Sequence, residues 1–214
     1  MTRMTSFRSR SGLRLGALGL ALALAGCGAS PEAKRYLLTS AAAPAPAAVA
    51  SGPRVMVAEA TVAPYFDRSQ LVSRPDDFRV EWDEFEVWAE PIGRLVTAKL
   101  VDDLAARYGR ARVMAARTGR ALDADFTVGA DVLRFDSDAG GAAVVELRWT
   151  LASERRGCLV ATDRMRVSRA FDASDAADET APDPRVQAYS EAMEEISARI
   201  AGAIETARTG AACL

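Results

Sequence analysis

The hydrophobic residues of this chain recur with two different periods, and the change of period marks its predicted elements. An apolar residue at every second position is typical of a strand with one buried face. This alternation is clearest over residues 125–135 and 145–151. The second of these segments places four large apolar residues on one face, Val145, Leu147, Trp149 and Leu151. With the shorter runs included, strands are predicted at residues 35–39, 54–59, 70–74, 78–82, 112–115, 125–135, 145–151 and 158–170.

Two other segments repeat their apolar residues every three or four positions, as one face of an α-helix does. The first begins at Pro91, a residue suited to a first helical turn, and stops at Gly109. Its apolar positions are Ile92, Leu95, Val96, Leu100 and Leu104. The second runs from about Pro184 to Arg208, with the stripe Val186, Tyr189, Met193, Ile196, Ile200 and Ile204. We expect both stripes to pack in the core rather than to bind a partner.

The order of the elements predicts the fold class. Strands come first, then a helix, then a meander of long strands, then a second helix, and no βαβ unit repeats. We therefore expect an α+β fold: a single domain with a mostly antiparallel sheet and two main helices packed on one face. Residues 70–74 and 78–82, on either side of the turn at Pro75, are expected to pair as a hairpin.

The N-terminal apolar run has a different character. Residues 15–25 are almost purely Leu, Ala and Gly, and the preceding residues include four arginines and no acidic residue. This is the layout of a secretory signal, and the run is too short for a membrane-spanning helix. It ends in Leu24-Ala25-Gly26-Cys27, which resembles the bacterial lipobox, where the cysteine is acylated and the chain is cut before it. An ordinary signal peptide with a chance cysteine is the alternative.

The predicted organisation follows from this cleavage site. Residues 1–26 are a lipoprotein signal peptide, and residues 27–53 comprise the lipid anchor at Cys27, a short strand and an Ala/Pro-rich linker. Residues 54–214 form the α+β domain. Loss of the signal arginines leaves 23 basic against 29 acidic residues, a net charge of −6. A chain this acidic is not expected to bind nucleic acid.

The composition also argues against catalysis. The chain contains no histidine, which excludes histidine acid/base chemistry, Ser-His and Cys-His nucleophile pairs and most catalytic zinc sites. A Ser-Lys hydrolase has only Lys34 and Lys99 to draw on, and no such site stands out. We therefore expect a protein that is not an enzyme and needs no cofactor or metal.

The remaining cysteines and the acidic turns leave narrower questions. Cys158 and Cys213 either pair in an oxidising compartment or stay as free thiols, and the sequence leaves both states open. The aspartates of residues 136–138 and 172–178 lack the spacing of a calcium-binding EF-hand loop. We interpret them as solvated turns.

Three motifs resemble those of the PqiC-like family of ABC-type transport auxiliary lipoproteins. They are Arg35-Tyr36-Leu37-Leu38 after the predicted lipid cysteine, the segment from Tyr65 to Arg74, and Trp88-Ala89-Glu90-Pro91-Ile92. Phe66, Ser69 and Ile92 depart mildly from the Leu, Pro and Leu of the family pattern. The resemblance is specific from Cys27 to about Leu104.

The resemblance implies a non-enzymatic adaptor of an envelope lipid-transport system, anchored on the periplasmic face of the outer membrane. Its implied partners are an MCE-domain protein with its ABC permease and ATPase, and homo-oligomerisation stays open. Tyr65, Phe66, Arg68, Arg74 and Trp88 are the candidate partner-binding residues, with hairpin ion pairing and core packing as the structural alternative. The alternative function is an envelope structural or assembly lipoprotein that regulates a cell-wall or surface machine.

Overall fold

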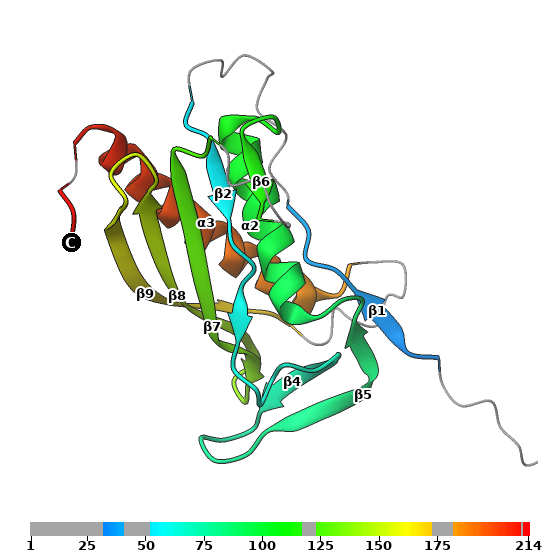
Figure 1. The fold of residues 1–214 in the computed structure, drawn as a ribbon. Helices are drawn as coiled ribbons and strands as arrows, with labels where there is room; N and C mark the ends of the chain where they lie inside the picture. Colours follow the sequence, from blue (N-terminus) through cyan, green and yellow to red (C-terminus); the bar gives the residue numbers. More distant parts are fainter. Residues whose placement is uncertain (1–31, 41–51, 117–122, 173–181, 211) are drawn as a thin grey trace, which may run out of the picture. The chain divides into compact units, whose positions relative to one another are not determined.

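Three long antiparallel strands form one side of the sheet (Figure 1). They are β7 (Phe126–Asp138), β8 (Ala142–Ser153) and β9 (Cys158–Ala170). Val128 of β7 pairs with Leu151 of β8, which in turn pairs with Ala161 of β9. The turns between them place Gly141 and Gly157 at positive φ, which glycine adopts without steric cost.

The computed structural model describes residues 32–40, 52–116, 123–172, 182–210 and 212–214. The predicted signal peptide, Cys27 and most of the predicted linker therefore lie outside the described residues. Ala33–Leu214 form one unit, and the following description concerns that unit. No helix among the described residues is long and apolar enough to cross a membrane.

Short strands line the other edge of β7. β2 (Val55–Val57), β3 (Thr61–Val62) and β4 (Gln70–Arg74) pair with it in parallel, one after another along its length. β6 (Val113–Ala115) lies parallel to β2. β5 (Glu81–Trp88) pairs antiparallel with β4, and β1 (Lys34–Tyr36) lies parallel to β5 at the edge of the sheet.

The predicted α+β class is confirmed, but the sheet is mixed. Its long meander is antiparallel, whereas five pairings of the short strands are parallel. Parallel neighbours need a crossover connection, and the chain supplies one between β2 and β6 through α2 (Ile92–Tyr108). The sequence pattern does not reveal it, because this crossover occurs once and its strands are three residues long.

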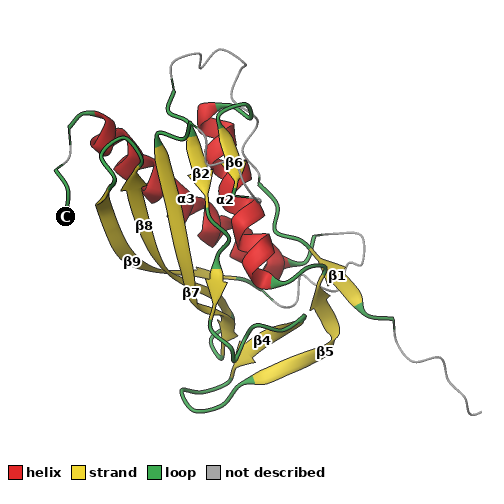
Figure 2. Ribbon diagram, viewed as in Figure 1, coloured by secondary structure: helices red, strands yellow, loops and turns green. Residues whose placement is uncertain are grey.

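The two helices, α2 and α3 (Pro184–Arg208), cover the same face of the sheet (Figure 2). Both apolar stripes are buried, as expected. Asp183 caps α3, its carboxylate accepting hydrogen bonds from the backbone N–H groups of Arg185 and Val186, which satisfies two of the unpaired donors at a helix start. Pro184 then occupies the first turn, where it is well tolerated.

An aromatic cluster packs the end of β5 and the C-terminal part of β7 against α3. Trp88 lies edge-on to Phe135 and to Tyr189, with ring centroids 5.6 and 5.7 Å apart. Phe135 and Tyr189 stack at 4.6 Å. Such pairs add to the free energy gained from burying the rings themselves, so this cluster holds β5, β7 and α3 together.

One predicted turn residue proves to be buried. Strand β7 continues to Asp138, three residues past its predicted end, and Asp136 is fully buried within it. The interpretation of Asp136 as a solvated turn is therefore wrong. Arg134 explains its position, because its Nε donates a hydrogen bond of 2.7 Å to Asp136 Oδ1. The other oxygen of this carboxylate has no hydrogen-bond partner among the described residues.

Candidate docking surface and arginine pocket

The structure divides the candidate partner-binding residues between the core and the surface. Phe66 and Trp88 are core residues, with 1% and 4% of their surface exposed. Neither offers a side chain to a partner in this conformation. Tyr65 is 36% exposed, and its hydroxyl donates a hydrogen bond of 3.3 Å to the backbone oxygen of Leu133. Its ring lies edge-on to Phe66 at 4.5 Å, so Phe66 supports Tyr65 from within.

The two arginines belong to the β4–β5 hairpin and its approach. The Arg68 guanidinium carbon lies 4.3 Å from the ring centroid of Trp82, a cation–π contact. Arg74 ends β4, and its Nη2 donates a hydrogen bond of 2.9 Å to the backbone oxygen of Asp77. Arg74 thus braces the hairpin turn, whereas Arg68 and Trp82 present a joint surface.

The Asp76 side chain fixes the backbone conformation of the hairpin turn. One carboxylate oxygen accepts hydrogen bonds from the backbone N–H groups of Phe78 and Arg79, and the other accepts one from Arg79 Nε. These bonds, led by that of the Arg79 side chain, lower the pKa of Asp76 below its usual value. With the backbone fixed in this way, Phe78 projects into solvent, 98% exposed.

A bulge in β5 turns another aromatic side chain outward. Val72 of β4 pairs with Trp82 of β5, whereas Gln70 pairs with Val87. The stretch of β5 between these two pairs is therefore longer than the stretch of β4 opposite it, and the extra residues form the bulge. The Asp83 carboxylate pins this irregularity by accepting hydrogen bonds from the backbone N–H groups of Phe85 and Glu86. Bulges commonly redirect side chains, and Phe85 here is 42% exposed.

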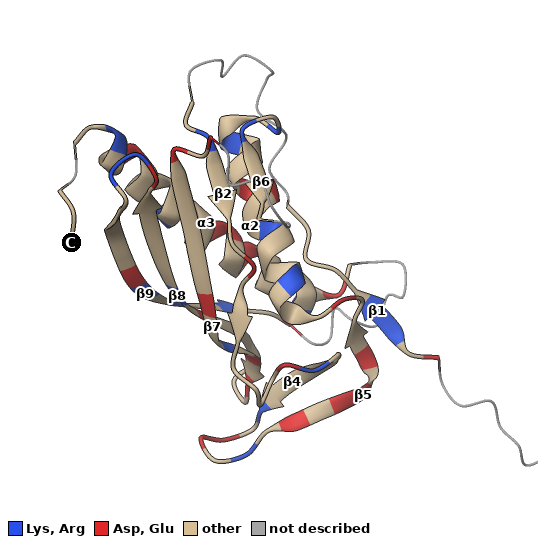
Figure 3. Cartoon of the chain, in the orientation of Figure 1, with Lys and Arg blue, Asp and Glu red and all other residues tan. Residues whose placement is uncertain are grey.

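Together these residues form a surface that we call the aromatic arm: the β4–β5 hairpin with Phe78, Trp82 and Phe85, and Arg68 stacked on Trp82. Trp82 is 43% exposed. Exposed carboxylates flank the aromatic residues, and acidic positions are prominent along β5 (Figure 3); they are Asp77, Glu81 and Glu84. Sequence reasoning missed these three aromatic residues. A signal was present, because acidic residues flank Trp82 and Phe85 within Glu81–Trp88 instead of leaving a clean apolar face.

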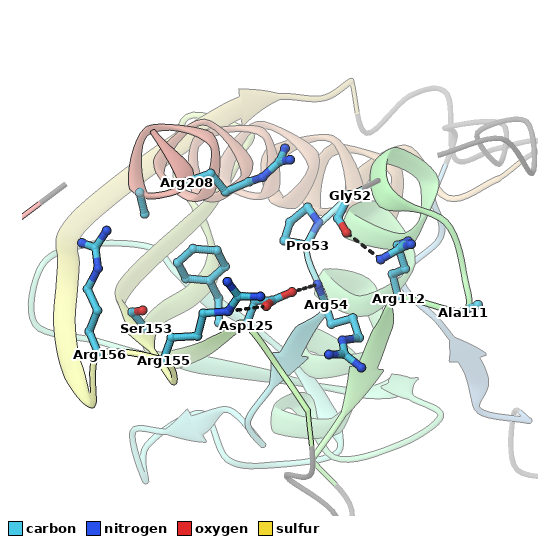
Figure 4. A pocket seen from close by; sticks show the side chains of 12 residues that line it. Gly52, Pro53, Arg54, Ala111, Arg112, Asp125, Ser153, Arg155, Arg156 and Arg208 are labelled. Atoms are coloured by element: carbon cyan, nitrogen blue, oxygen red, sulfur yellow. Dashed lines mark hydrogen bonds and ion pairs between the residues drawn. The ribbon is translucent and has the colours of Figure 1, made fainter. Parts of the chain in front are cut away.

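A second feature lies at the other end of β7, where the chain forms a cavity of about 770 Å³ (Figure 4). The segments before β2 and β6, the start of β7, the β8–β9 turn and the last turn of α3 surround it. We call it the arginine pocket after five of its lining residues, Arg54, Arg112, Arg155, Arg156 and Arg208. Asp125 is the one acidic residue among the described residues that line it.

Polar contacts fix several of these arginines. Arg155 Nε lies 3.2 Å from Asp125 Oδ1, and Asp125 Oδ2 accepts a hydrogen bond from the backbone N–H of Arg54. Arg112 Nη1 donates a 2.6 Å hydrogen bond to the backbone oxygen of Gly52. Sequence reasoning missed this site as well, because its arginines are far apart in the chain and only Arg155 and Arg156 are adjacent.

The two cysteines of the domain are bonded to each other. A disulfide joins Cys158, the first residue of β9, to Cys213, one of the two states that the sequence left open. The backbone N–H of Leu214 also donates a 2.9 Å hydrogen bond to the backbone oxygen of Leu159. The C-terminal end is therefore fastened to the start of β9.

Within the described residues, no three Asp, Glu, Cys or His side chains lie close enough together to hold a metal ion.

Comparison with known proteins found one matching family and several similar structures. The model of the ABC-type transport auxiliary lipoprotein component family matches residues 36–201. A crystal structure from Xanthomonas campestris, assigned to the DUF330 family, is 22% identical, with a TM-score of 0.64, and the match covers 82% of this chain and 98% of that one. The crystal structure of an uncharacterized protein is 20% identical, with a TM-score of 0.61 and coverage of 81% and 99%. Comparison with curated proteins returned no match.

Proposed function

This chain belongs to the ABC-type transport auxiliary lipoprotein component family, and on that premise we propose that it is a non-enzymatic adaptor of an envelope lipid-transport system. In this proposal Cys27 carries acyl chains that hold the protein on the periplasmic face of the outer membrane. The domain docks an MCE-domain protein that works with an ABC permease and ATPase. The family match supports a transport auxiliary role, and the partner and the membrane are the proposed additions.

The aromatic arm is the observation that favours docking. Phe78, Trp82 and Phe85 are exposed on one hairpin, although aromatic side chains are usually the most valuable to bury. Aromatic residues and arginine are also enriched among the residues that contribute most to protein–protein binding. Arg68 on Trp82 adds a preformed cation–π pair to this surface.

The acidic residues around the aromatic arm indicate which kind of partner surface would fit it. Asp77, Glu81 and Glu84 border the arm, so a partner with an apolar centre and basic residues around it would be complementary. Such charged borders chiefly speed association and select the partner, whereas the buried centre supplies most of the affinity.

Copurification after crosslinking in intact cells tests the docking proposal. We expect the wild type to retain an MCE-domain protein and Trp82→Ala with Phe85→Ala to lose it, since each truncation of a central aromatic residue costs about 2 kcal/mol or more. Met114→Ala with Leu159→Ala is the matched control, because these side chains are similarly exposed outside the arm. Tyr65→Ala with Arg68→Ala tests in the same way the two exposed candidate residues that precede β4, and it is likewise expected to lose the partner.

Circular dichroism must show that each variant is folded. Retention of the partner by the folded Trp82→Ala and Phe85→Ala variant would refute docking through the arm. Failure of any envelope protein to copurify with the wild type would refute the adaptor role itself.

The anchor has its own test. Mass spectrometry is expected to find acyl chains on Cys27 of the wild type, and Cys27→Ser is expected to accumulate as an unmodified precursor. Gly28 follows the cysteine, whereas retention in the inner membrane usually favours aspartate there, so we expect the protein in the outer-membrane fraction. Recovery with the inner membrane would contradict the proposed location but not the acylation.

A further inference from the structure

Strand β9 forms an open edge of the sheet. It pairs with β8 on one side, and none of the other described strands pairs with its second side; Figure 1 shows it at the outer side of the meander. Open edges are usually short or interrupted because they can pair with another chain, yet β9 has 13 residues and no proline. We propose that this edge binds an extended acidic segment of a partner protein as an additional antiparallel strand. The proposal does not depend on the aromatic arm.

The hydrogen-bonding pattern identifies the backbone groups of β9 that face outward. The N–H of Phe171, just past the strand, donates to the backbone oxygen of Gly141 on the β8 side. Bonded and non-bonded residue pairs alternate along an antiparallel ladder, and the register is regular from Ala161 to Ala170. The even-numbered residues of this stretch therefore turn their N–H and C=O groups away from β8. They include Thr162, Arg164, Arg166 and Ser168.

Bonds within the chain occupy a few groups of this edge. The pairs are Leu214 N–H to Leu159 O, Arg164 N–H to Asp163 Oδ1, and Arg169 Nη1 to Ser168 O. The last two are exposed bonds, and because such bonds contribute little net free energy, an incoming strand can replace them. The N–H and C=O groups of Thr162 and Arg166 have no partner among the described residues.

The side chains of the outward-facing residues favour an acidic partner. Arg164 and Arg166 are two residues apart, hence on the same face of β9, and both are exposed. Arg164 contacts Glu146 of β8, whereas Arg166 forms no salt bridge with a described residue. In an antiparallel pair, the residue opposite each arginine would place its side chain on this same face, where opposite charges attract. Glutamates at every second position of the partner segment would meet both arginines.

The other face of β9 provides room for the residues between those glutamates. A groove of about 680 Å³ lies between β9 and α3, lined by Asp163 and Met165 of the strand and by Ala198 and Gly202 of the helix. A Cβ at Gly202 would meet no atom of another described segment within 4 Å, so the helix leaves space there. Asp163 would repel a further carboxylate, and small apolar side chains such as valine therefore fit this side. Main-chain bonds would supply affinity, and the alternating side chains would supply specificity.

Isothermal titration of the purified lipoprotein in non-ionic detergent tests the proposal with a short synthetic peptide in which glutamate and valine alternate. We expect this peptide to bind, and a peptide of the same length with lysine in place of glutamate not to bind. In the proposed pairing, the N–H groups of the glutamates face β9 and those of the valines face away. Methylation of the glutamate nitrogens should therefore abolish binding, whereas methylation of the valine nitrogens should preserve it.

Two substitutions test the protein side of the pairing. Ser168→Pro removes an outward N–H without breaking the ladder to β8 and should weaken binding by about tenfold or more. Ser168→Ala keeps this N–H and is the matched control. Arg166→Gln should weaken binding by about threefold or more. Arg94→Gln, at an exposed position of α2, should leave it unchanged.

Three results would overturn the proposal: no binding of the glutamate peptide to the wild type, equal binding by folded Ser168→Pro and Ser168→Ala, or equal binding of the two methylated peptides. If circular dichroism shows that Ser168→Pro is unfolded, the methylated peptides decide the question with the wild type alone. Light scattering without peptide tests the other occupant. A wild type that self-associates, with a Ser168→Pro variant that does not, would assign the edge to a second copy of this chain and refute the partner segment.

Discussion

Lys99 Nζ lies 2.6 Å from Asp103 Oδ1, one turn further along α2, and both side chains are sealed from solvent between the two helices. Glu194 of α3 approaches the same Nζ at 3.4 Å. The hydroxyls of Ser40 and Ser197 donate hydrogen bonds of 2.6 and 2.8 Å to the Asp103 carboxylate. A buried charge is tolerated only when paired and hydrogen-bonded, and this network meets that condition while joining α2, α3 and the segment after β1.

Replacing Lys99 with methionine is expected to destabilise the fold by about 3 kcal/mol, because it leaves the Asp103 carboxylate buried without its cation. Guanidinium chloride unfolding followed by circular dichroism measures the change. Lys34→Met, at an exposed position of β1, is the control and should change stability by less than about 0.5 kcal/mol. Equal stability of the two variants would show that the ion pair contributes nothing.

Gly93→Ala should destabilise the protein although alanine is the better helix former. A Cβ at Gly93 would lie 2.6 Å from the backbone oxygen of Ala60 and 3.2 Å from Val62 Cγ2, so α2 would have to move away from the segment between β2 and β3. Overpacking of this kind costs about 1–3 kcal/mol.

Gly202→Ala is the matched helical control for this substitution. A Cβ at Gly202 would meet no atom of another described segment within 4 Å, so α3 should gain up to about 1 kcal/mol. Thermal unfolding of both variants gives the comparison, and the prediction fails if both substitutions raise the melting temperature.

Asp136→Asn should change the pH dependence of stability. Burial raises the pKa of Asp136 above its ordinary value, against the opposing effect of Arg134. A carboxyl group with a raised pKa in the folded state contributes stability at low pH that is lost as the pH rises through that value.

Asparagine cannot ionise, so the melting temperature of Asp136→Asn relative to the wild type is expected to increase as the pH rises from about 4 to 7. The carboxyl groups of Asp76 and Asp131, whose pKa values are lowered, act in the opposite direction but are present in both proteins. Scanning calorimetry at several pH values gives the difference. A difference that falls with rising pH would contradict the assignment.

Loss of the Cys158–Cys213 disulfide should lower the free energy of unfolding by up to about 4 kcal/mol. The two cysteines are 55 residues apart, and the chain-entropy model assigns a closed loop of this length that upper value. Denaturation of the wild type and of Cys158→Ser with Cys213→Ser, each with and without reductant, tests it. Reductant should affect only the wild type, and two titratable thiols in the unreduced native protein would refute the bond.

The long elements could be predicted from the sequence, whereas the short ones and the candidate site could not. The bounds of β9 and α3 coincide with their predictions, because over many residues periodicity outweighs local exceptions. Strand β3 has two residues and carries no period at all. The extent of β5 was missed because the bulge at Asp83 breaks its alternation.

For two of the candidate partner-binding residues, Phe66 and Trp88, the structure favours the alternative of core packing. Phe66 stands next to Asp67, and Trp88 lies within a segment that carries Glu86 and Glu90. The burial of Trp88 comes from its tertiary contacts with Phe135 and Tyr189, which make the end of β5 part of the core. The arginine pocket likewise exists only because distant segments end at the same place. The spacing of residues in the sequence does not show which distant segments lie close together in the fold.

The edge position of β1 has a mechanical consequence. Any tension applied through the chain before Lys34, as from an anchor at Cys27, enters the fold at the three residue pairs between β1 and β5. Those pairs, and the hydrogen bond from the backbone N–H of Thr39 to Ser190 Oγ, bear the load before β7, β8 or either helix does. Peeling β1 away would lengthen the N-terminal segment by several residues and leave the meander of β7, β8 and β9 folded, so tension on that segment would be absorbed at the edge of the sheet.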